Sequence, residues 1–231
     1  MQIPDITRLA DIFFSLLFIL LVLPVWIIVI PLLRFTGEGE VFYRQPRVGQ
    51  GGKHFDLLKF ATMLKDSPNL GTGDLTLHND PRVLPVGRFL RKTKINELPQ
   101  LFNVLKGDLS IAGPRPQTPR IFALYPREIQ EGLIRMRPGL SGVGAILFRG
   151  EERMTREAEN PTVFYSDVIK PYKGKAELWY LQHRSLWAYL MVIFVTIWVI
   201  LFPNSSLPWR AFPGLPAPPQ ELAHFWNRPS T

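Results

Sequence analysis

The sequence contains no cysteine among its 231 residues. This excludes a disulfide framework, a catalytic thiolate and any cysteine-ligated metal site. Charged residues are absent from two stretches, residues 12–33 and residues 187–203. Acidic residues are absent from a third, residues 82–94. This third stretch holds five cations, Arg82, Arg88, Arg91, Lys92 and Lys94. Two long apolar runs beside a dense basic segment are not typical of an ordinary soluble protein.

The net charge of +8 is concentrated in the middle of the chain. Residues 34–185 hold 24 Lys and Arg against 16 Asp and Glu, and the two ends together add three of each. A basic domain beside an apolar run favours an anionic membrane surface, an anionic substrate, or both as binding partners. No helix-turn-helix, zinc-finger or RNA-binding signature is present in the sequence, so we expect no nucleic-acid partner.

Residues 12–33 would measure roughly 33 Å as a helix, which is long enough to cross the apolar core of a bilayer. Pro24 lies near the middle of this run, and proline inside a helix removes a backbone donor and kinks the axis. Two interpretations stay open. The run is a simple anchor with a tolerated proline, or it is broken at Pro24 and leaves the membrane on the side it entered. A cleaved signal peptide is not expected, because Arg8 is the only cation before the run.

The middle of the chain begins with a predicted β-hairpin. Residues 37–60 alternate between apolar and polar side chains around a Gly-rich turn. Residues 65–81 are rich in turn residues and are expected to form a surface loop. Residues 151–186 are charged and are predicted to be helical.

A helix with one apolar face is predicted after the basic segment, from the i, i+3, i+4, i+7 spacing of Leu98, Leu101, Phe102 and Leu105. It should begin near Asn96 and stop at Gly107. A helix N-terminus facing the five cations would form a pocket for phosphate groups. The competing interpretation is structural. Asn96 is a preferred N-cap residue, Glu97 suits a first turn without any catalytic role, and a charge run is often only a solvated face.

Residues 187–203 are at the short end of the length that a spanning helix needs. The tail, residues 204–231, is rich in proline and is expected to be irregular.

The sequence from Thr93 to Pro116 resembles the signature of a bacterial sugar transferase family, the monotopic polyprenyl-phosphate phosphoglycosyl transferases. The family pattern is Thr-Ser-x-Asp-Glu-Leu-Pro-Gln-Leu-x-Asn-Val-Leu-x-Gly-(Asp/Glu)-Met-Ser-x-x-Gly-Pro-Arg-Pro. The chain matches it at Thr93 and, almost position by position, from Glu97 to Pro116. It departs at Asn96, where the family has the Asp of its catalytic dyad.

Other segments of the middle domain extend the resemblance. Residues 41–49 match Val-Phe-x-Arg-Gln-x-Arg-Val-Gly, and residues 59–63 match Lys-Phe-Arg-(Thr/Ser)-Met except for Ala61. Residues 137–142 match Arg-Pro-Gly-(Ile/Leu)-(Thr/Ser)-Gly. The family then usually has an aromatic residue or Ala followed by Gln, and this chain has Gly144-Ala145. We therefore expect its sugar specificity to differ.

The apolar runs also resemble the family. Arg8 and Asp11 match a Lys/Arg-x-x-x-Asp element, and Leu23-Pro24 stands where the family has Ser-Pro at the break of a re-entrant helix. The family usually has an Asp in the second apolar run, and residues 187–203 lack it. Its absence favours spanning or deep insertion of that run.

The resemblance implies a membrane-associated α/β protein in three parts. These are a re-entrant membrane helix over residues 1–36, a small, mainly helical catalytic domain with a short hairpin over residues 37–186, and an apolar helix with a Pro-rich tail over residues 187–231. The implied location is the bacterial inner membrane, with the catalytic domain on the cytoplasmic face.

The implied activity is transfer of a phosphosugar from a UDP-sugar to polyprenyl (undecaprenyl) phosphate, releasing UMP, with Mg²⁺ as cofactor. This would be the first membrane step of polysaccharide or glycoconjugate synthesis. Arg91, Arg115 and Arg137 are expected to hold the diphosphate and the lipid phosphate, because a planar guanidinium fork suits phosphate.

Asn96 leaves the chemical mechanism open, because a neutral amide cannot replace the attacking carboxylate. Glu97 could be nucleophile as well as metal ligand, or the lipid phosphate could attack directly while Asn96 orients groups. Alternatively the protein is a catalytically silent scaffold that binds nucleotide-sugar or lipid phosphate at the membrane. Two apolar runs are too few for a transporter. The sequence leaves the sugar, the glycan and formation of a homodimer open.

Overall fold

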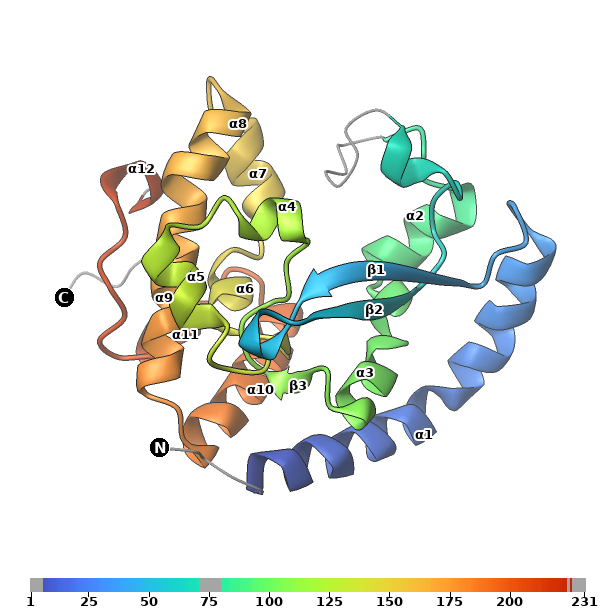
Figure 1. Ribbon diagram of the computed structural model, residues 1–231, viewed down its shortest axis with the longest axis horizontal. Helices are drawn as coiled ribbons and strands as arrows, with labels where there is room; N and C mark the ends of the chain where they lie inside the picture. Colours follow the sequence, from blue (N-terminus) through green and yellow to red (C-terminus); the bar gives the residue numbers. More distant parts are fainter. Residues whose placement is uncertain (1–5, 71–79, 224, 226–231) are drawn as a thin grey trace.

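The computed structural model describes residues 6–70, 80–223 and 225. These residues form a mainly helical α/β protein with two small sheets (Figure 1). The helices are α1 (Ile6–Phe35), α2 (Pro85–Lys92), α3 (Gln100–Lys106), α4 (Pro119–Phe122), α5 (Arg127–Leu133), α6 (Val143–Leu147), α7 (Glu151–Arg156), α8 (Pro161–Phe164), α9 (Lys170–Gln182), α10 (Leu186–Leu201), α11 (Leu207–Ala211) and α12 (Gln220–Ala223). Short 3-10 helices are η1 (Gln50–Gly52), η2 (Ser67–Asn69) and η3 (Ile95–Glu97), and η4 (Tyr165–Ile169) is a π-helix. The strands are β1 (Phe42–Val48), β2 (His54–Phe60), β3 (Ser110–Ala112) and β4 (Gly139–Ser141).

The predicted hairpin is confirmed. Strands β1 and β2 pair antiparallel from Phe42 opposite Phe60 to Val48 opposite His54. The turn contains Gly51 and Gly52, both with φ near +70°, a conformation that glycine adopts without a steric penalty. The second sheet is a short parallel pair, β3 with β4, which brings residues 110–112 beside residues 139–141.

Helix α1 is continuous from Ile6 to Phe35, so the expected interruption at Pro24 is not present. The axis instead curves through the second half of the helix (Figure 1), which is the usual effect of an internal proline. Packing explains the continuity. Ser15 before Pro24 and Trp26 after it are both buried against the rest of the molecule. Tertiary contacts therefore hold both halves in helical form.

The polar N-terminal turns of α1 dock onto the middle of the chain. Asp11 is 1 % exposed, and its Oδ1 accepts hydrogen bonds from Ser110 Oγ, the Ile111 backbone N–H and Tyr189 OH, each at 2.9 Å. Arg8 donates to the carbonyl oxygens of Val104 and Leu105 at the end of α3. This matched pair of charged residues therefore fixes α1 to α3, β3 and α10.

The other end of α1 is also packed against the domain. Trp26, Val29 and Leu33 form a buried cluster with Phe60 of β2 and Leu90 of α2. The Trp26 ring also lies 5.0 Å from the Phe102 ring of α3. Both halves of α1 therefore contact the same body of protein.

Helix α10 packs in a similar way. Tyr189, Val192, Val195 and Val199 are buried along one face. Thr196 Oγ1 lies 2.7 Å from Ser141 Oγ at the end of β4. One face of the 16-residue helix α10 is thus buried against the domain, and its other side is exposed for the spanning or deep insertion expected of residues 187–203.

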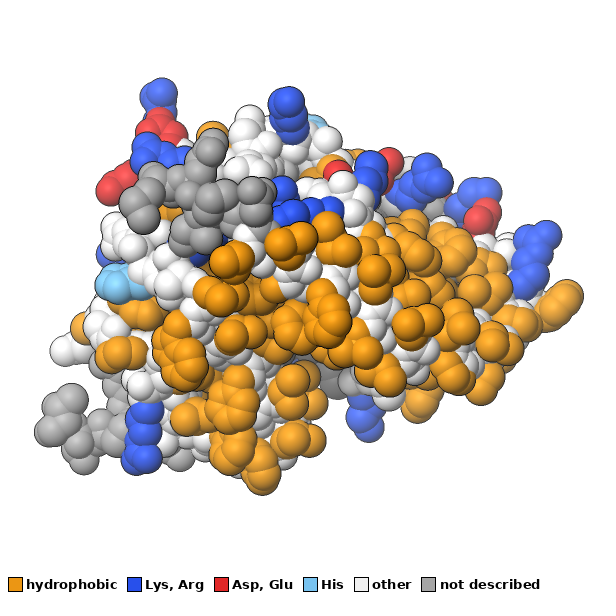
Figure 2. Space-filling view, turned by 90° about the horizontal axis from the view of Figure 1, so that it is seen from below, with side chains coloured by type: hydrophobic (Ala, Val, Ile, Leu, Met, Phe, Trp, Pro, Cys, Tyr) orange, Lys and Arg blue, Asp and Glu red, His pale blue; other side chains and the backbone are white. Residues whose placement is uncertain are grey.

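The outward sides of α1 and α10 are apolar. Figure 2 views the molecule from below the orientation of Figure 1, and a broad hydrophobic face fills the view, with Lys and Arg mainly along its edges. Its largest exposed side chains on these helices include Leu9, Phe13, Leu20, Leu21, Ile27, Ile28, Trp187, Ile200 and Leu201. Within the described residues, α1 is the one helix long and apolar enough to cross a membrane. A surface of this kind is consistent with membrane association.

The tail is more ordered than its composition predicted. It contains α11 and α12, and Phe212 and Leu222 are buried in the main core. Tyr172 OH of α9 donates to the carbonyl oxygen of Pro216 at 2.8 Å. The expectation of an irregular tail is therefore wrong over its described part, because apolar side chains anchor it to α9.

Candidate active site

Glu97 and Arg115 form an ion pair at the centre of the site, with Arg115 Nη2 2.7 Å from Glu97 Oε1. Glu97 lies on η3, and Arg115 follows β3 between two prolines that stiffen its loop. Burial raises the pKa of Glu97, but Arg115, Lys94 and Lys59 outweigh it and lower the pKa to about 2. Glu97 is therefore a charged carboxylate at neutral pH.

The hairpin supplies a third charged group that sequence reasoning did not select. Lys59 Nζ donates to Gln45 Oε1 at 3.1 Å, and Arg47 Nη2 donates to the same oxygen at 2.5 Å. Burial and the nearby Arg47 lower the pKa of Lys59 to about 7, while Glu97 opposes the shift. The signal was present in the sequence, because Lys59 opens the Lys-Phe-Ala-Thr-Met segment.

Asn96 is buried at 6 % exposure next to Glu97 in the chain. It caps no helix. Lys94 is the N-cap of η3, Pro99 is the N-cap of α3, and neither cap has a side-chain hydrogen bond. The capping interpretation of Asn96 is therefore wrong. Its Oδ1 is buried and has no hydrogen-bond partner among the described residues. A buried polar atom without a partner is costly, which indicates a role beyond local packing.

The backbone that presents Glu97 is strained. Lys94 has a φ of 62°, and it is the one non-glycine residue with positive φ in the described part of the chain. Such a conformation costs about 1–3 kcal/mol and is common at functional sites. It turns the chain sharply between α2 and η3. The predicted start of an α-helix at Asn96 is thus corrected to Gln100, and the site does not rely on a helix N-terminus.

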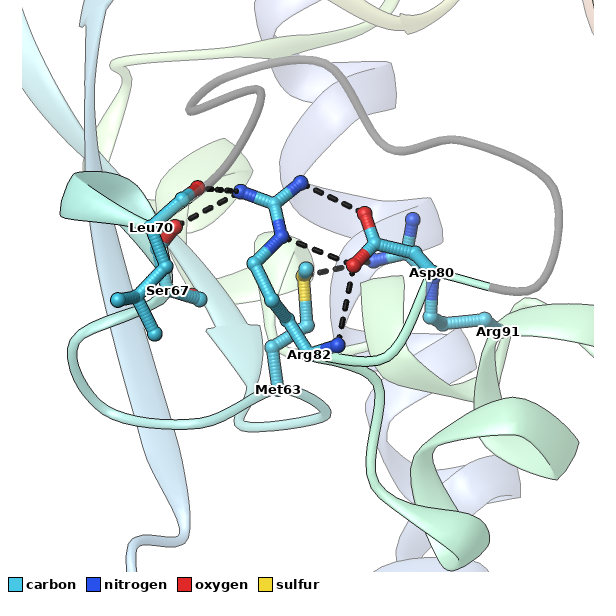
Figure 3. Close-up of polar contacts among 6 residues, drawn as sticks. All are labelled: Met63, Ser67, Leu70, Asp80, Arg82 and Arg91. Atoms are coloured by element: carbon cyan, nitrogen blue, oxygen red, sulfur yellow. Dashed lines mark hydrogen bonds and ion pairs between the residues drawn. The ribbon is translucent and has the colours of Figure 1, made fainter.

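The basic segment does not act as one pocket. Arg82 is 5 % exposed, and its guanidinium is held by both carboxylate oxygens of Asp80 and by the carbonyl oxygens of Ser67 and Leu70 (Figure 3). Its role is to fix local structure. Arg88 and Lys92 are solvent-exposed. The prediction of a five-cation phosphate pocket is therefore wrong for Arg82 and stays a prediction for Arg88 and Lys92.

Arg91 lies at the edge of the site. Its Nη1 is 3.7 Å from the Met63 sulfur (Figure 3), and its charge contributes to lowering the pKa of Lys59. Arg91 and Lys94 are therefore the members of the basic segment whose charges act on Lys59 and Glu97.

Arg137 is turned towards α1. Its Nη1 lies 3.8 Å from Asp11 Oδ2, and burial, followed by the charge of Arg8, lowers its pKa. Arg115 is therefore paired with Glu97, whereas Arg137 is paired with Asp11. Arg115 belongs to the cluster around Glu97, and Arg137 belongs to the contact between α1 and the domain.

No group of three or more Asp, Glu, His or Cys side chains that could hold a metal occurs among the described residues. The oxygen atoms present nevertheless suit Mg²⁺, which is commonly held by one or two carboxylates together with substrate phosphates. Glu97 offers a carboxylate, and the adjacent Asn96 offers the buried, unpartnered Oδ1. These residues therefore fit a magnesium ion that is completed by a diphosphate.

Comparison with known proteins shows what the sequence as a whole is similar to. The sequence profile of the family described as "Bacterial sugar transferase" matches residues 4–203. The undecaprenyl-phosphate glucose phosphotransferase of Komagataeibacter xylinus is 33% identical over 204 residues, which is 86% of this chain and 36% of that protein. The exopolysaccharide production protein ExoY of Rhizobium meliloti (strain 1021) is 31% identical over 213 residues, 86% of this chain and 87% of that protein.

A third relative covers less of this chain at higher identity. The putative undecaprenyl-phosphate N-acetylgalactosaminyl 1-phosphate transferase of Bacillus subtilis (strain 168) is 40% identical over 154 residues, 67% of this chain and 79% of that protein. The lengths differ widely among relatives, since this chain spans little more than a third of the K. xylinus protein.

Proposed function

Because the chain belongs to the bacterial sugar transferase family, we propose that it transfers a sugar 1-phosphate from a UDP-sugar to undecaprenyl phosphate and releases UMP. The name of the K. xylinus relative gives undecaprenyl phosphate. The name of another relative, the UDP-N-acetylgalactosamine-undecaprenyl-phosphate N-acetylgalactosaminephosphotransferase of Aeromonas hydrophila, gives a UDP-sugar as well; it is 33% identical over 198 residues, 85% of this chain and 44% of that protein. The observation that carries the proposal is the ionised Glu97 beside Arg115 and the half-buried Lys59. An anionic diphosphate fits a site in which cations surround one carboxylate.

The chemistry that fits this site begins with attack on the β-phosphorus of the UDP-sugar. Glu97 is the residue of the dyad that still carries a carboxylate. If its oxygen attacks, an acyl-phosphate bond forms, the bond between the β-phosphorus and the bridging oxygen breaks, and UMP leaves with the electron pair. Undecaprenyl phosphate then attacks the same phosphorus and releases Glu97. If the lipid phosphate attacks directly, Glu97 and Asn96 only hold the groups in line.

Mg²⁺ would offset the negative charge of the diphosphate when it is bound. The Glu97 carboxylate and the Asn96 Oδ1 atom would hold this ion. Arg115 and Lys59 would contact phosphate oxygens, and the fork of Arg115 favours a bidentate contact. Arg91 would contact phosphate at the edge of the site. Arg137 is proposed to serve the lipid phosphate, because it lies beside the N-terminal turns of α1 and the apolar face.

The proposed membrane arrangement has both ends of α1 on the side of the catalytic domain. Arg8 binds α3 near one end, and Leu33 packs with Phe60 and Leu90 near the other. A spanning helix would place its ends on opposite sides of an apolar layer about 30 Å thick. A re-entrant helix at the inner membrane that is curved rather than broken at Pro24, with both ends on the side of the domain, avoids this conflict. The basic composition of residues 34–185 favours the cytoplasmic face.

The decisive experiment measures UMP release from a panel of UDP-sugars, with and without undecaprenyl phosphate and Mg²⁺. We expect release that requires lipid phosphate with at least one UDP-sugar. Asn96→Asp should not increase it, because a second carboxylate beside Glu97 would repel the diphosphate in a site built around an amide. If the wild type releases no UMP and Asn96→Asp gains this activity, the chain is a silent scaffold that binds the same substrates.

A further inference from the structure

A second buried carboxylate lies behind the arginine loop, which we define as residues 113–118. Glu177 of α9 is 2 % exposed. Its Oε1 accepts a hydrogen bond from the Gly144 backbone N–H at 3.1 Å. Burial raises the pKa of its carboxyl group, and the Arg115 backbone N–H acts in the opposite direction. Glu177 thus lies where residues 142–144 pack against Gly113 of the arginine loop.

The glycines around Glu177 are required by close contacts. A Cβ atom at Gly144 would lie 2.7 Å from Glu177 Oε1 and 3.0 Å from Lys173 Cγ. A Cβ atom at Gly142 would lie 2.2 Å from the Gly113 carbonyl oxygen and 3.0 Å from Glu177 Oε1. Contacts below 3.0 Å force atoms to move. The size of the residue at position 144 and the length of the side chain at position 177 are therefore matched.

Helix α9 reaches the arginine loop at a second point. Lys170 Nζ donates to Gln117 Oε1 at 3.3 Å and lies 4.1 Å from the centre of the Tyr125 ring. Lys173 is paired with Glu151, so it does not neutralise Glu177 directly. Glu177 Oε2 is buried and has no hydrogen-bond partner among the described residues. The carboxyl group is thus retained at a cost in desolvation, which indicates that its backbone contacts matter.

We propose that Glu177 is a positioning residue for Arg115, and that it acts by holding the arginine loop and the turn at Gly144 in register. The proposal rests on the proposed function, since the guanidinium it orients is the one that meets Glu97 and the substrate diphosphate. Nothing in Glu177 itself touches the reacting atoms. Its effect on turnover passes through the direction of the Arg115 side chain, which a small displacement of the loop would change.

The matched sizes at positions 144 and 177 give a direct test. Gly144→Ala should push Glu177 away and raise the KM for the UDP-sugar about tenfold or more, with a smaller change in kcat. Glu177→Asp alone should also raise KM, because the shorter side chain withdraws from the two amides. The double variant, Gly144→Ala with Glu177→Asp, should recover most of the loss, because Asp leaves room for the new methyl group. If the factor by which KM rises in the double variant equals the product of the two single-variant factors, the proposal is overturned.

A second cycle tests whether the effect passes through Arg115. Glu177→Gln should raise KM about tenfold in the wild type and change little in an Arg115→Ala background, because coupled residues are not additive. If Glu177→Gln raises KM by the same factor with Arg115 and with Arg115→Ala, Glu177 only supports the fold. Thermal unfolding of every variant in the same detergent separates loss of fold from loss of orientation.

A readout without turnover keeps this proposal separate from the proposed function. Binding of UDP, measured by calorimetry, should weaken in Gly144→Ala and recover in the double variant even if the wild type releases no UMP. If UMP is released and the double variant recovers neither KM nor UDP binding, the transferase stands and the role of Glu177 is refuted.

Discussion

Glu97 is charged because cations surround it, and its neighbour Asn96 is neutral and buried. Glu97 is thus the one carboxylate of the Asn96–Glu97 pair. Burial lowers the pKa of Lys59, and the charges of Arg47 and Arg115 lower it further. A bound diphosphate would bring negative charge that favours the charged form of Lys59.

Turnover should depend on the charge of Glu97. We expect Glu97→Gln to reduce UMP release by at least about a thousandfold, because the amide neither attacks phosphorus nor binds a metal well. The shape is retained, so thermal unfolding should change little. Glu128→Gln is the matched control, since Glu128 is exposed on α5. Near-normal release by Glu97→Gln would eliminate both the nucleophile and the metal-ligand roles. A hydroxylamine-sensitive adduct mapped to Glu97 would establish the covalent route.

Glu177 should make stability depend on pH. Burial raises its pKa from 4.5 to about 7, although Lys173 and the amides of Gly144 and Arg115 oppose the shift. The folded protein therefore keeps a proton that the unfolded chain releases between pH 4.5 and 7, and this contribution to stability is lost as pH rises through that window. The free energy of unfolding of the wild type should fall relative to Glu177→Gln by up to about 3 kcal/mol.

Denaturant unfolding of both proteins at pH 5, 6, 7 and 8 measures this difference. The groups that act on Glu177 are Lys173 and the two amides. Burial raises the pKa of Tyr125 and of Tyr180, and the charge of Glu177 adds to the rise. A difference that stays constant over the range would show that Glu177 remains ionised in the folded protein.

At the scale of elements, the sequence predicted the helices and strands that are specified by residues close together in the chain. The Gly-rich turn specified the β1–β2 hairpin, and the apolar spacing specified α3. The start of α3 was placed too early, because the 3-10 turn at Asn96 depends on the strained backbone of Lys94. The role of Arg82 was missed because Asp80 and two distant carbonyl groups take up its charge. The direction of Arg137 depends on α1, which lies far away in sequence.

The arrangement of α1 has a clear test, because the chain has no native cysteine. Single cysteines at Gln2 and Gln50 flank the helix in sequence, one before α1 and one in the hairpin turn. A re-entrant helix places both on the cytoplasmic side. An impermeant maleimide should then label both in inverted membrane vesicles and neither in intact spheroplasts. Labelling from opposite sides would establish a spanning helix instead.

At the scale of the whole molecule, the three segments predicted from sequence pack against one another. The main cluster joins Leu57 of the hairpin, Tyr189 and Val199 of α10, and Phe212 and Leu222 of the tail, and the second half of α1 forms its own cluster with Phe60 and Leu90. The family match ends at residue 203, so the described tail adds core residues beyond it. The composition of the tail did not predict this packing, because its high proline content indicates irregular structure although a few of its apolar side chains are buried.

The tail should therefore contribute to stability. Phe212 is 2 % exposed and its ring packs edge-on against Trp179. We expect Phe212→Ala to lower the free energy of unfolding by about 3–5 kcal/mol, the usual cost of removing a buried ring. Phe202→Ala is the control, because Phe202 is 51 % exposed and should change little in detergent. Equal unfolding midpoints for the two variants would show that the tail is not part of the cooperative unit.

The docking of α1 through Arg8, Asp11 and Trp26 has a practical consequence for handling the protein. Removing residues 1–36 would not yield a water-soluble fragment. Without Arg8, the carbonyl groups at the end of α3 would lose their hydrogen-bond donor. Without Asp11, Ser110 and Tyr189 would lose the acceptor that they share. The apolar cluster around Phe60 would be exposed to solvent. Removal of α1 would therefore remove part of the folded domain together with the apolar helix. Purification should therefore keep detergent present from cell lysis onward.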